Sequence, residues 1–314
     1  MHGTTLRRRI AATLFPGLVL AAAAVAATAL PAAAGDAARG TAALDSRTPF
    51  YLPHMTWDEV EQYLRTSDLV IVPVGSIEQH GRHLPLDSDI VQATEICLRI
   101  GQRARVLVAP VVLAGVSEHH MAFPGTIALS PATFEAVLYE TAQSLIAHGF
   151  RRIIFYSGHG GNYTSVHNVA FRVNRETPAL AIDLLNVAFP DPDPKITGLK
   201  SDSHAGVEET SMMLFLAPGL VQMAKAENPR LTYPPEVQAI LEKTTGGDRD
   251  ALLDALLFQP LSSGKHTSTR EFTNNGVVTA DDVKTANAEL GRLAVDYRVE
   301  GVVRFIEAWR KAAP

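Results

Sequence analysis

The stretch Val72-Pro-Val-Gly-Ser-Ile-Glu-Gln-His-Gly-Arg-His-Leu-Pro-Leu-Asp-Ser-Asp89 determines how the rest of this chain is interpreted. It begins within an apolar run, Leu69–Val74, whose uninterrupted hydrophobicity predicts a buried strand. Gly75 ends the run, and five ionisable side chains follow within one short loop: Glu78, His80, His83, Asp87 and Asp89. Carboxylate oxygen and neutral imidazole nitrogen are the ligands that Zn, Mn and Fe(II) take in proteins.

The spacing of the first two of these side chains suits a shared site. In an extended segment, side chains two residues apart point the same way. Glu78 and His80 can therefore face one site while Gln79 faces away from it. By itself the stretch leaves two interpretations open, a divalent metal site or a polar surface loop that follows a strand.

The composition limits the classes of function. The chain has 314 residues, a formal net charge of -5, 46% hydrophobic residues, 19% charged residues and one cysteine. This length is enough for one large or two small domains with a hydrophobic core. No basic stripe is present to neutralise phosphates, which argues against binding to nucleic acid. With Cys97 alone, an intramolecular disulfide and a thiolate metal site are excluded, so any metal must be held by His, Asp and Glu.

The N-terminal residues have the features of an export signal over residues 1–34. Arg7-Arg-Arg9 precedes an apolar, alanine-rich stretch, Ile10 to Leu30, and small residues follow it. We predict cleavage after Ala34 and a linker over residues 35–50. The mature protein would then be periplasmic or secreted, with no membrane contact, and the arginines raise the twin-arginine route. The alternative is a retained membrane anchor, because the stretch approaches the ~20 residues that span a bilayer.

Strand and helix patterns alternate after residue 56. Apolar runs predict strands over 69–74, 106–113, 152–156 and 179–185, and helical patterns lie over 57–64, 90–103, 131–148 and 163–174. Such alternation predicts a parallel sheet covered by helices on both faces, with ligands at the carboxyl ends of the strands. Glu78 and His80 follow the first strand, Ser117–His120 the second, and His159 the third. This convergence favours the metal site over the surface loop.

The segment after residue 200 adds further polar side chains. His204, Glu208 and Glu209 precede an apolar helical pattern, and His204 and Glu208, four residues apart, would be neighbours on one helix face. A structural ion pair is the alternative explanation for that spacing. Residues 225–270 are rich in Pro, Gly and Lys and predict an insertion or lid, and residues 282–309 predict a long amphipathic helical region.

Four motifs together resemble the creatininase (creatinine amidohydrolase) family. They are Gly75-Ser-Ile-Glu-Gln-His-Gly-Arg-His-Leu-Pro-Leu-Asp-Ser-Asp89, Phe123-Pro-Gly-Thr126, Ser157-Gly-His-Gly-Gly-Asn162 and His204-Ala-Gly-x-x-Glu-Thr-Ser211. Four motifs in the right order are specific for the family. They are less specific for the substrate, because the family also holds deformylases, mycofactocin-precursor peptidases and other cyclic-amide hydrolases.

The resemblance implies a three-layer α/β/α sandwich with a mostly parallel central sheet, as a single catalytic domain over residues 51–314. It implies a homo-oligomer, often a hexamer, and two divalent metal ions, Zn, Mn or Fe, bridged by a carboxylate. Carried over by position, Glu78 and His159 hold one metal, His80 holds the other, and Asp89 bridges them. Creatininase has a further ligand, a glutamate, where this chain has Gly161. Glu209 is our candidate to replace it.

The chemistry that the resemblance implies is attack by metal-activated water on a non-peptide C–N amide bond of a small cyclic amide or a formamide. His204 and Glu208 would carry protons, and Ser117 and His120 would contact the substrate. Ser203 stands where creatininase has a proton-carrying glutamate, which argues against creatinine as the substrate. The alternatives are a metal-dependent lactonase or phosphoesterase, and a non-catalytic protein that binds a metal or small molecule on the same fold.

Overall fold

The computed structural model describes residues 47–184, 198–199, 202–232, 238–239, 242–245 and 268–312. The predicted export signal, most of the predicted linker and much of the predicted 225–270 insertion lie outside these residues. From Arg47 on, the described residues form one compact unit. Within them, no helix combines the length and the apolar character needed to cross a membrane.

The central sheet contains four parallel strands in the order β2-β1-β3-β4. They are β1 (Leu69–Val74), β2 (Leu107–Val108), β3 (Arg152–Ser157) and β4 (Leu180–Asp183). The prediction for β1 is confirmed to the residue. β2 is shorter than predicted, because the backbone rejoins β1 beyond Pro110 only through an isolated bridge between Val112 and Val74. Proline has no N–H to donate to a ladder.

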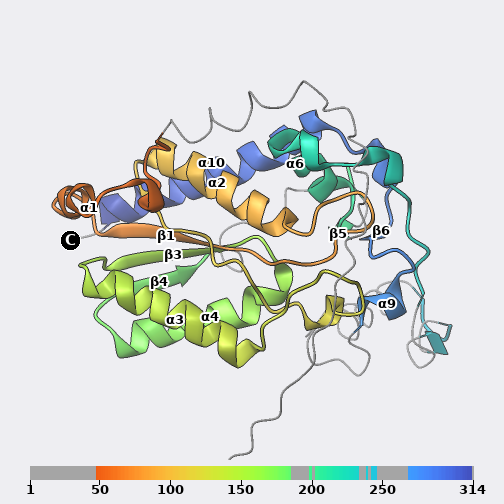
Figure 1. Ribbon diagram of the computed structural model, residues 1–314, viewed down its shortest axis with the longest axis horizontal. Coiled ribbons are helices and arrows are strands. Elements are labelled where there is room, and N and C mark those ends of the chain that lie inside the picture. The colour runs from red at the N-terminus through yellow and green to blue at the C-terminus, as the bar shows by residue number, and fades with distance from the viewer. Residues whose placement is uncertain are drawn as a thin grey trace, which may run out of the picture. The chain divides into compact units, whose positions relative to one another are not determined.

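Helices cover both faces of the sheet (Figure 1). Successive side chains of a strand point to opposite faces, so Val70, Val72 and Val74 of β1 join one core and Leu69 and Ile71 the other. The first core packs under α3 (Pro131–Ala147) and α4 (Tyr163–Glu176), and the second under α2 (Ser88–Ala104) and α10 (Ala288–Ala312). The predicted three-layer α/β/α architecture is therefore confirmed.

Local signals place the helix ends. Thr56 and Glu59 form a capping box at the start of α1 (Trp57–Leu64), and the Ser130 hydroxyl caps α3, which begins with a proline. α10 begins six residues later than the helical pattern, because Asp282 instead caps a short 3-10 turn. The 3-10 turns span Leu52–His54, Glu118–His120, Gly160–Asn162, Pro218–Leu220, Met223–Lys225 and Val283–Thr285.

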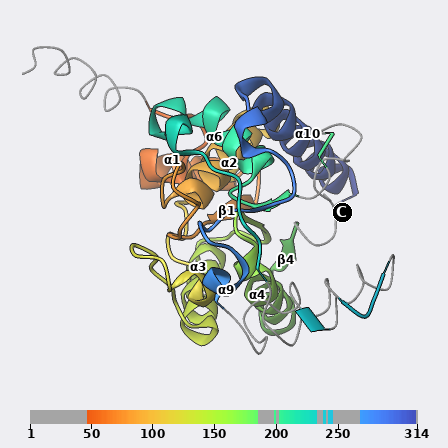
Figure 2. The same cartoon turned by 90° about the vertical axis from the view of Figure 1, so that its right-hand side faces the viewer.

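A second, two-stranded sheet lies beyond the carboxyl ends of the parallel strands (Figure 1), on the side of the molecule that faces the viewer in Figure 2. It pairs β5 (Asp202–His204) antiparallel with β6 (Val278–Thr279). β5 leads into α6 (Val207–Leu216), which packs on α10, and α9 (Thr269–Phe272) precedes β6. This small sheet brings the late part of the chain to the edge where the early motifs end.

Candidate metal centre

The loop that follows β1 is held against the start of α2. A Cβ at Gly75 would lie 2.7 Å from Ile90 Cγ1 and 2.9 Å from its Cα, so a side chain would separate the loop from the helix. Asn162 ties the same point to the neighbouring loops, since its amide donates to the Gly75 carbonyl oxygen and its Oδ1 accepts from the Val116 N–H. As a result, Glu78, His80 and Asp89 are all buried.

Side chains from the loops after β1 and β3 meet at one point, as predicted. His159 Nε2, after β3, lies 3.1 Å from Glu78 Oε2, and His159 Nδ1 lies 3.4 Å from Asp89 Oδ2. His80 Nε2 lies 3.1 Å from Asp89 Oδ1 and 3.8 Å from Glu209 Oε2 at the start of α6. The expected convergence at the carboxyl edge of the sheet is confirmed.

The neutral ring of His80 would present a lone pair to Asp89. Its Nδ1 lies 3.2 Å from the Glu78 carbonyl oxygen, which can only accept, so Nδ1 carries the proton of the neutral ring. The Nε2 lone pair then faces Asp89 Oδ1, and two electron-rich atoms at that distance need a cation or a proton between them. Burial opposes the charged ring, but Asp89 prevails and raises the pKa of His80 to about 10. Metal-binding histidines commonly donate their other N–H to a carbonyl in this way.

His159 repeats this arrangement on the other side of Asp89. Its Nε2 lies 3.0 Å from the Val116 carbonyl oxygen, so the lone pair of the neutral ring is left on Nδ1, facing Asp89. Burial would lower the pKa of His159, but the Glu78 carboxylate raises it to about 9. Glu78 itself is fully buried, yet the imidazoles of His159 and His120 hold its pKa well below the usual range.

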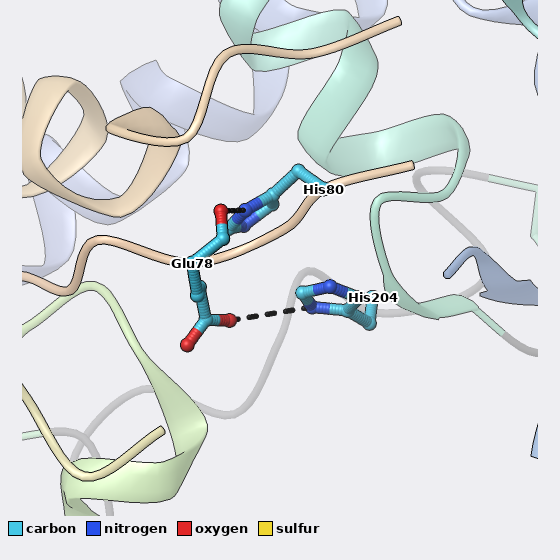
Figure 3. Close-up of side chains that lie close together, drawn as sticks. All are labelled: Glu78, His80 and His204. Atoms are coloured by element: carbon cyan, nitrogen blue, oxygen red, sulfur yellow. Dashed lines mark hydrogen bonds and ion pairs between the residues drawn. The ribbon is translucent and has the colours of Figure 1, made fainter. Parts of the chain in front are cut away.

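The donor set fits divalent cations. Glu78 Oε1 and Asp89 Oδ2 are buried and accept no hydrogen bond from the described residues. Ligand atoms gather into three groups: Glu78, Asp89 and His159; His80, Asp89 and Glu209; and Glu78, His80 and His204. Figure 3 shows the third group, in which Glu78 and His80 come from the loop after β1 and His204 from the end of β5. The first two groups share Asp89, so its carboxylate is placed to bridge two ions.

Gly161 has no room for a side chain. A Cβ at this position would collide with the Val116 carbonyl oxygen and with His159 Nε2, and would lie 3.0 Å from His119 Cε1. No glutamate side chain can start from here without moving that loop. Glu209 instead reaches the site from the first turn of α6, and its Oε2 accepts from the Ala205 N–H.

The two residues expected to contact the substrate are placed differently. Ser117 is fully buried behind Glu78, to whose Oε2 its hydroxyl donates at 2.6 Å, and it contacts Ser76 on its other side. This corrects the expectation for Ser117, which supports the carboxylate and has no surface left for a substrate. His120 lies beside the same carboxylate, with Nε2 3.2 Å from Glu78 Oε1.

His204 and Glu208 do not share a helix face, which corrects a second expectation. The chain leaves β5 at His204, passes Ala205 at a φ of 49°, and enters α6 only at Val207. His204 Nδ1 lies 3.7 Å from Glu78 Oε1, inside the centre. The Glu208 carboxylate forms an ion pair with Arg298 on α10, and its backbone N–H donates to Asp202. We therefore retain His204, and not Glu208, as the candidate proton carrier.

Several residues around the centre have contacts that the sequence does not predict. Gln79, expected to face away, contacts both His120 and His204. His83 bonds Thr210 on α6, and His119 is buried against the rings of His120 and His159. Each lies within or beside a motif, but apart from the contact between His119 and His120 the partners lie 40 to 127 positions away, which a local pattern cannot reveal.

Comparison with known proteins places this chain among the members of one family. The family model described as creatinine amidohydrolase matches residues 53–306. Creatinine amidohydrolase of Pseudomonas putida is 30% identical over 205 residues, which cover 59% of this chain and 79% of that protein. The mycofactocin precursor peptide peptidase of Mycolicibacterium smegmatis is 35% identical over 164 residues, covering 48% and 58%. A 3-dehydro-scyllo-inosose hydrolase of Thermotoga maritima is 29% identical over 147 residues, covering 45% and 46%.

Solved structures of creatininases are also similar to this chain. A structure titled as Mn creatininase superposes with a TM-score of 0.65 at 25% identity, covering 82% of this chain and 98% of that one. A mutant creatininase of Zn-Zn type gives a TM-score of 0.64 at 25% identity, covering 82% and 97%. These two creatininases are named for Mn and for paired Zn, and this chain has groups of carboxylate and imidazole ligands at the carboxyl edge of its sheet.

Proposed function

Because the chain belongs to the creatininase family, we propose that it is a metal-dependent amidohydrolase that cleaves the C–N bond of a small cyclic amide or a formamide. The observation that carries this proposal is the pair of ligand groups that share Asp89, one with Glu78 and His159 and one with His80 and Glu209. When bound there, divalent ions would supply an activated water and polarise the substrate carbonyl.

Other residues of the chain would hold the metal ligands in place and transfer protons. Ser117 and Asn162 hold Glu78 and its loop in place, as outer partners of metal ligands commonly do. His204 Nε2 lies 2.8 Å from the Gln79 carbonyl oxygen and so carries the ring proton, which leaves the Nδ1 lone pair facing Glu78. That nitrogen would take a proton from the attacking water and return it to the leaving nitrogen.

The substrate class rests on two observations. Ser203 replaces the proton-carrying glutamate of creatininase, so we do not propose creatinine itself. The similar proteins act on different molecules by name, among them creatinine, a precursor peptide and an inosose, so the family allows several substrates. We also propose export, from the character of residues 1–34, and assembly of several copies, from the family resemblance.

Metal analysis and a substrate panel test the proposal together. We expect close to two equivalents of Zn or Mn per chain, and hydrolysis within a panel of lactams, formamides, creatinine, a lactone and a phosphoester. Asp89→Asn should lose both metals and the activity. The matched control is Asp87→Asn, because Asp87 lies in the same loop but makes no side-chain capping bond. Failure of the wild-type chain to bind metal would overturn the proposal.

The proton carrier can be tested separately. His204→Gln should lower kcat by about 10²-fold or more, the contribution typical of a general acid or base, without loss of metal. Glu208→Gln should leave kcat within about twofold, because that side chain faces Arg298. The reverse order of effects would restore Glu208 as the proton carrier.

A further inference from the structure

Gln79 lies at the junction of four segments of the centre. It follows Glu78 directly and is 3% exposed. Its side-chain amide reaches His120 on the loop after β2, His204 at the end of β5, and the Gly276 carbonyl oxygen before β6.

Two backbone groups, one that can only donate a hydrogen bond and one that can only accept, show which atom of the Gln79 amide is the oxygen and which is the nitrogen. The Gly81 backbone N–H, which can only donate, lies 3.0 Å from Gln79 Oε1. The Gly276 carbonyl oxygen, which can only accept, lies 3.0 Å from Gln79 Nε2. The orientation of the amide is therefore determined by the backbone, and Nε2 has one hydrogen left to donate.

The remaining hydrogen goes to His120. Gln79 Nε2 lies 3.0 Å from His120 Nδ1 and 2.9 Å from His204 Nε2. His204 Nε2 also lies 2.8 Å from the Gln79 carbonyl oxygen, to which it must donate, so it cannot accept from the amide. His120 Nδ1 is then the acceptor for the amide, and the Thr269 hydroxyl, 2.9 Å from that nitrogen, shares the same lone pair as a second donor.

The two histidines are thereby left in opposite roles. An imidazole that accepts at Nδ1 is neutral and carries its proton on Nε2, and His120 Nε2 lies 3.2 Å from Glu78 Oε1. His204 carries its proton on Nε2 and presents its Nδ1 lone pair toward the same oxygen at 3.7 Å. One ring directs its N–H and the other its lone pair toward the same carboxylate oxygen.

We propose that Gln79 is a positioning residue that sets the tautomers of both histidines, His120 through its side-chain amide and His204 through its main-chain carbonyl. The backbone keeps the amide where it is. Gly276 has a φ of 91°, and a Cβ there would collide with Gln79 Oε1. Gly81 has a φ of 66°, in the left-handed region that favours glycine. The tautomers follow from the contacts alone, whereas their value for catalysis rests on the proposed function.

Nitrogen-15 NMR of the histidine rings tests the tautomers without any turnover. Metal-free and Zn-loaded protein labelled at the histidine nitrogens would be compared, with the His120 signals assigned by their absence from His120→Gln. We expect an Nε2–H tautomer for His120 and for His204 in the wild type. In Gln79→Glu, the carboxylate can only accept, so His120 should switch to Nδ1–H while His204 stays unchanged. Gln102→Glu, on the exposed face of α2, controls for the added charge.

The spectra test the assignment of the tautomers, and the kinetics test their role in catalysis. An Nδ1–H tautomer for His120 in the wild type, or no switch in Gln79→Glu, would overturn the assignment, and the wild-type spectrum is decisive even if the variant fails to fold. Kinetics then test the consequence: Gln79→Glu should keep its metal and its KM within about twofold but lose at least tenfold in kcat. Full kcat with a switched tautomer would overturn the catalytic part alone. An inactive wild type with the expected tautomers would overturn only the proposed amidohydrolase.

Discussion

His80 and His159 each hold a proton that a cation must displace. Asp89 and Glu78 raise their pKa values to about 10 and about 9, so both rings are protonated at pH 7 in the metal-free protein. Metal binding requires the neutral ring, and it therefore releases protons. Metal affinity should therefore rise with pH, because protons compete with the cation for the two rings. The rise should end as the pH passes through about 9 to 10, where the rings lose these protons.

We predict release of about two protons when the centre fills at pH 7. Calorimetric titration with Zn in buffers of different ionisation enthalpy measures this number directly. The Asp89→Asn variant, which lacks the carboxylate that faces both rings and should bind no metal there, gives the background heat of the titration. A binding enthalpy that does not depend on the buffer would contradict the protonation states described above.

Gly161 makes a second prediction possible at the same scale. Gly161→Ala places a Cβ against the Val116 carbonyl oxygen and His159 Nε2, and we expect a loss of about 1–3 kcal/mol in the free energy of unfolding, the usual cost of overpacking. Metal content should fall with it. Gly160→Ala is the matched control, since its Cβ would meet Tyr163 Cε2 at 3.9 Å, an ordinary contact. Denaturant unfolding with metal analysis compares the two variants.

The residues of the centre show which parts of the site can be predicted from the sequence. Glu78, His80 and Asp89 could be predicted as a group because they lie within twelve positions of one another. The burial of Ser117 and the role of Gln79 could not, because they depend on which distant segment lies behind each side chain. Glu208 was assigned to the centre because Arg298, its partner, is 90 positions away and leaves no local signal.

Among the elements, the strands and helices of the first half follow their patterns closely. β1 matches its apolar run, and the starts of α1 and α3 match their caps, because each of these signals is local. β2 and α10 differ from their predicted bounds. Pro110 interrupts the pairing of β2 with β1, and Asp282 caps a separate 3-10 turn before α10 begins. The strand order β2-β1-β3-β4 is set by long-range packing, which no single segment encodes.

The crossing of α6 and α10 leads to a prediction for these elements. A Cβ at Gly291 would collide with the Ser211 carbonyl and approach the Met212 nitrogen to 2.8 Å. Alanine gains about 1 kcal/mol of helix propensity over glycine, but the collision is with backbone and cannot be relieved by a rotamer. We expect Gly291→Ala to lower the unfolding free energy, whereas Gly219→Ala, with no atom within 4 Å of its Cβ, should not. Denaturant unfolding monitored by circular dichroism gives both values.

For the molecule as a whole, stability should depend on the concentration of free metal. A ligand that binds only the folded state at 100 times its Kd stabilises it by about 2.7 kcal/mol. For a domain of this size we expect each bound ion to raise Tm by roughly 5–10 °C. Thermal unfolding with Zn and with a chelator measures the shift. Asp89→Asn should show almost none, and an equal shift in that variant would place the stabilising ion elsewhere.

The position of Glu209 at the start of α6 has a kinetic consequence. An ion held by His80, Asp89 and Glu209 would join the start of α6 to the loop after β1, so it would act as a reversible cross-link across a long segment of chain. Closing such a loop is costly in entropy until the sheet between its ends has formed. Interactions that form after the folding barrier slow unfolding and leave the refolding rate unchanged. Loaded protein should therefore survive proteases far longer than the metal-free chain, although both refold at the same speed.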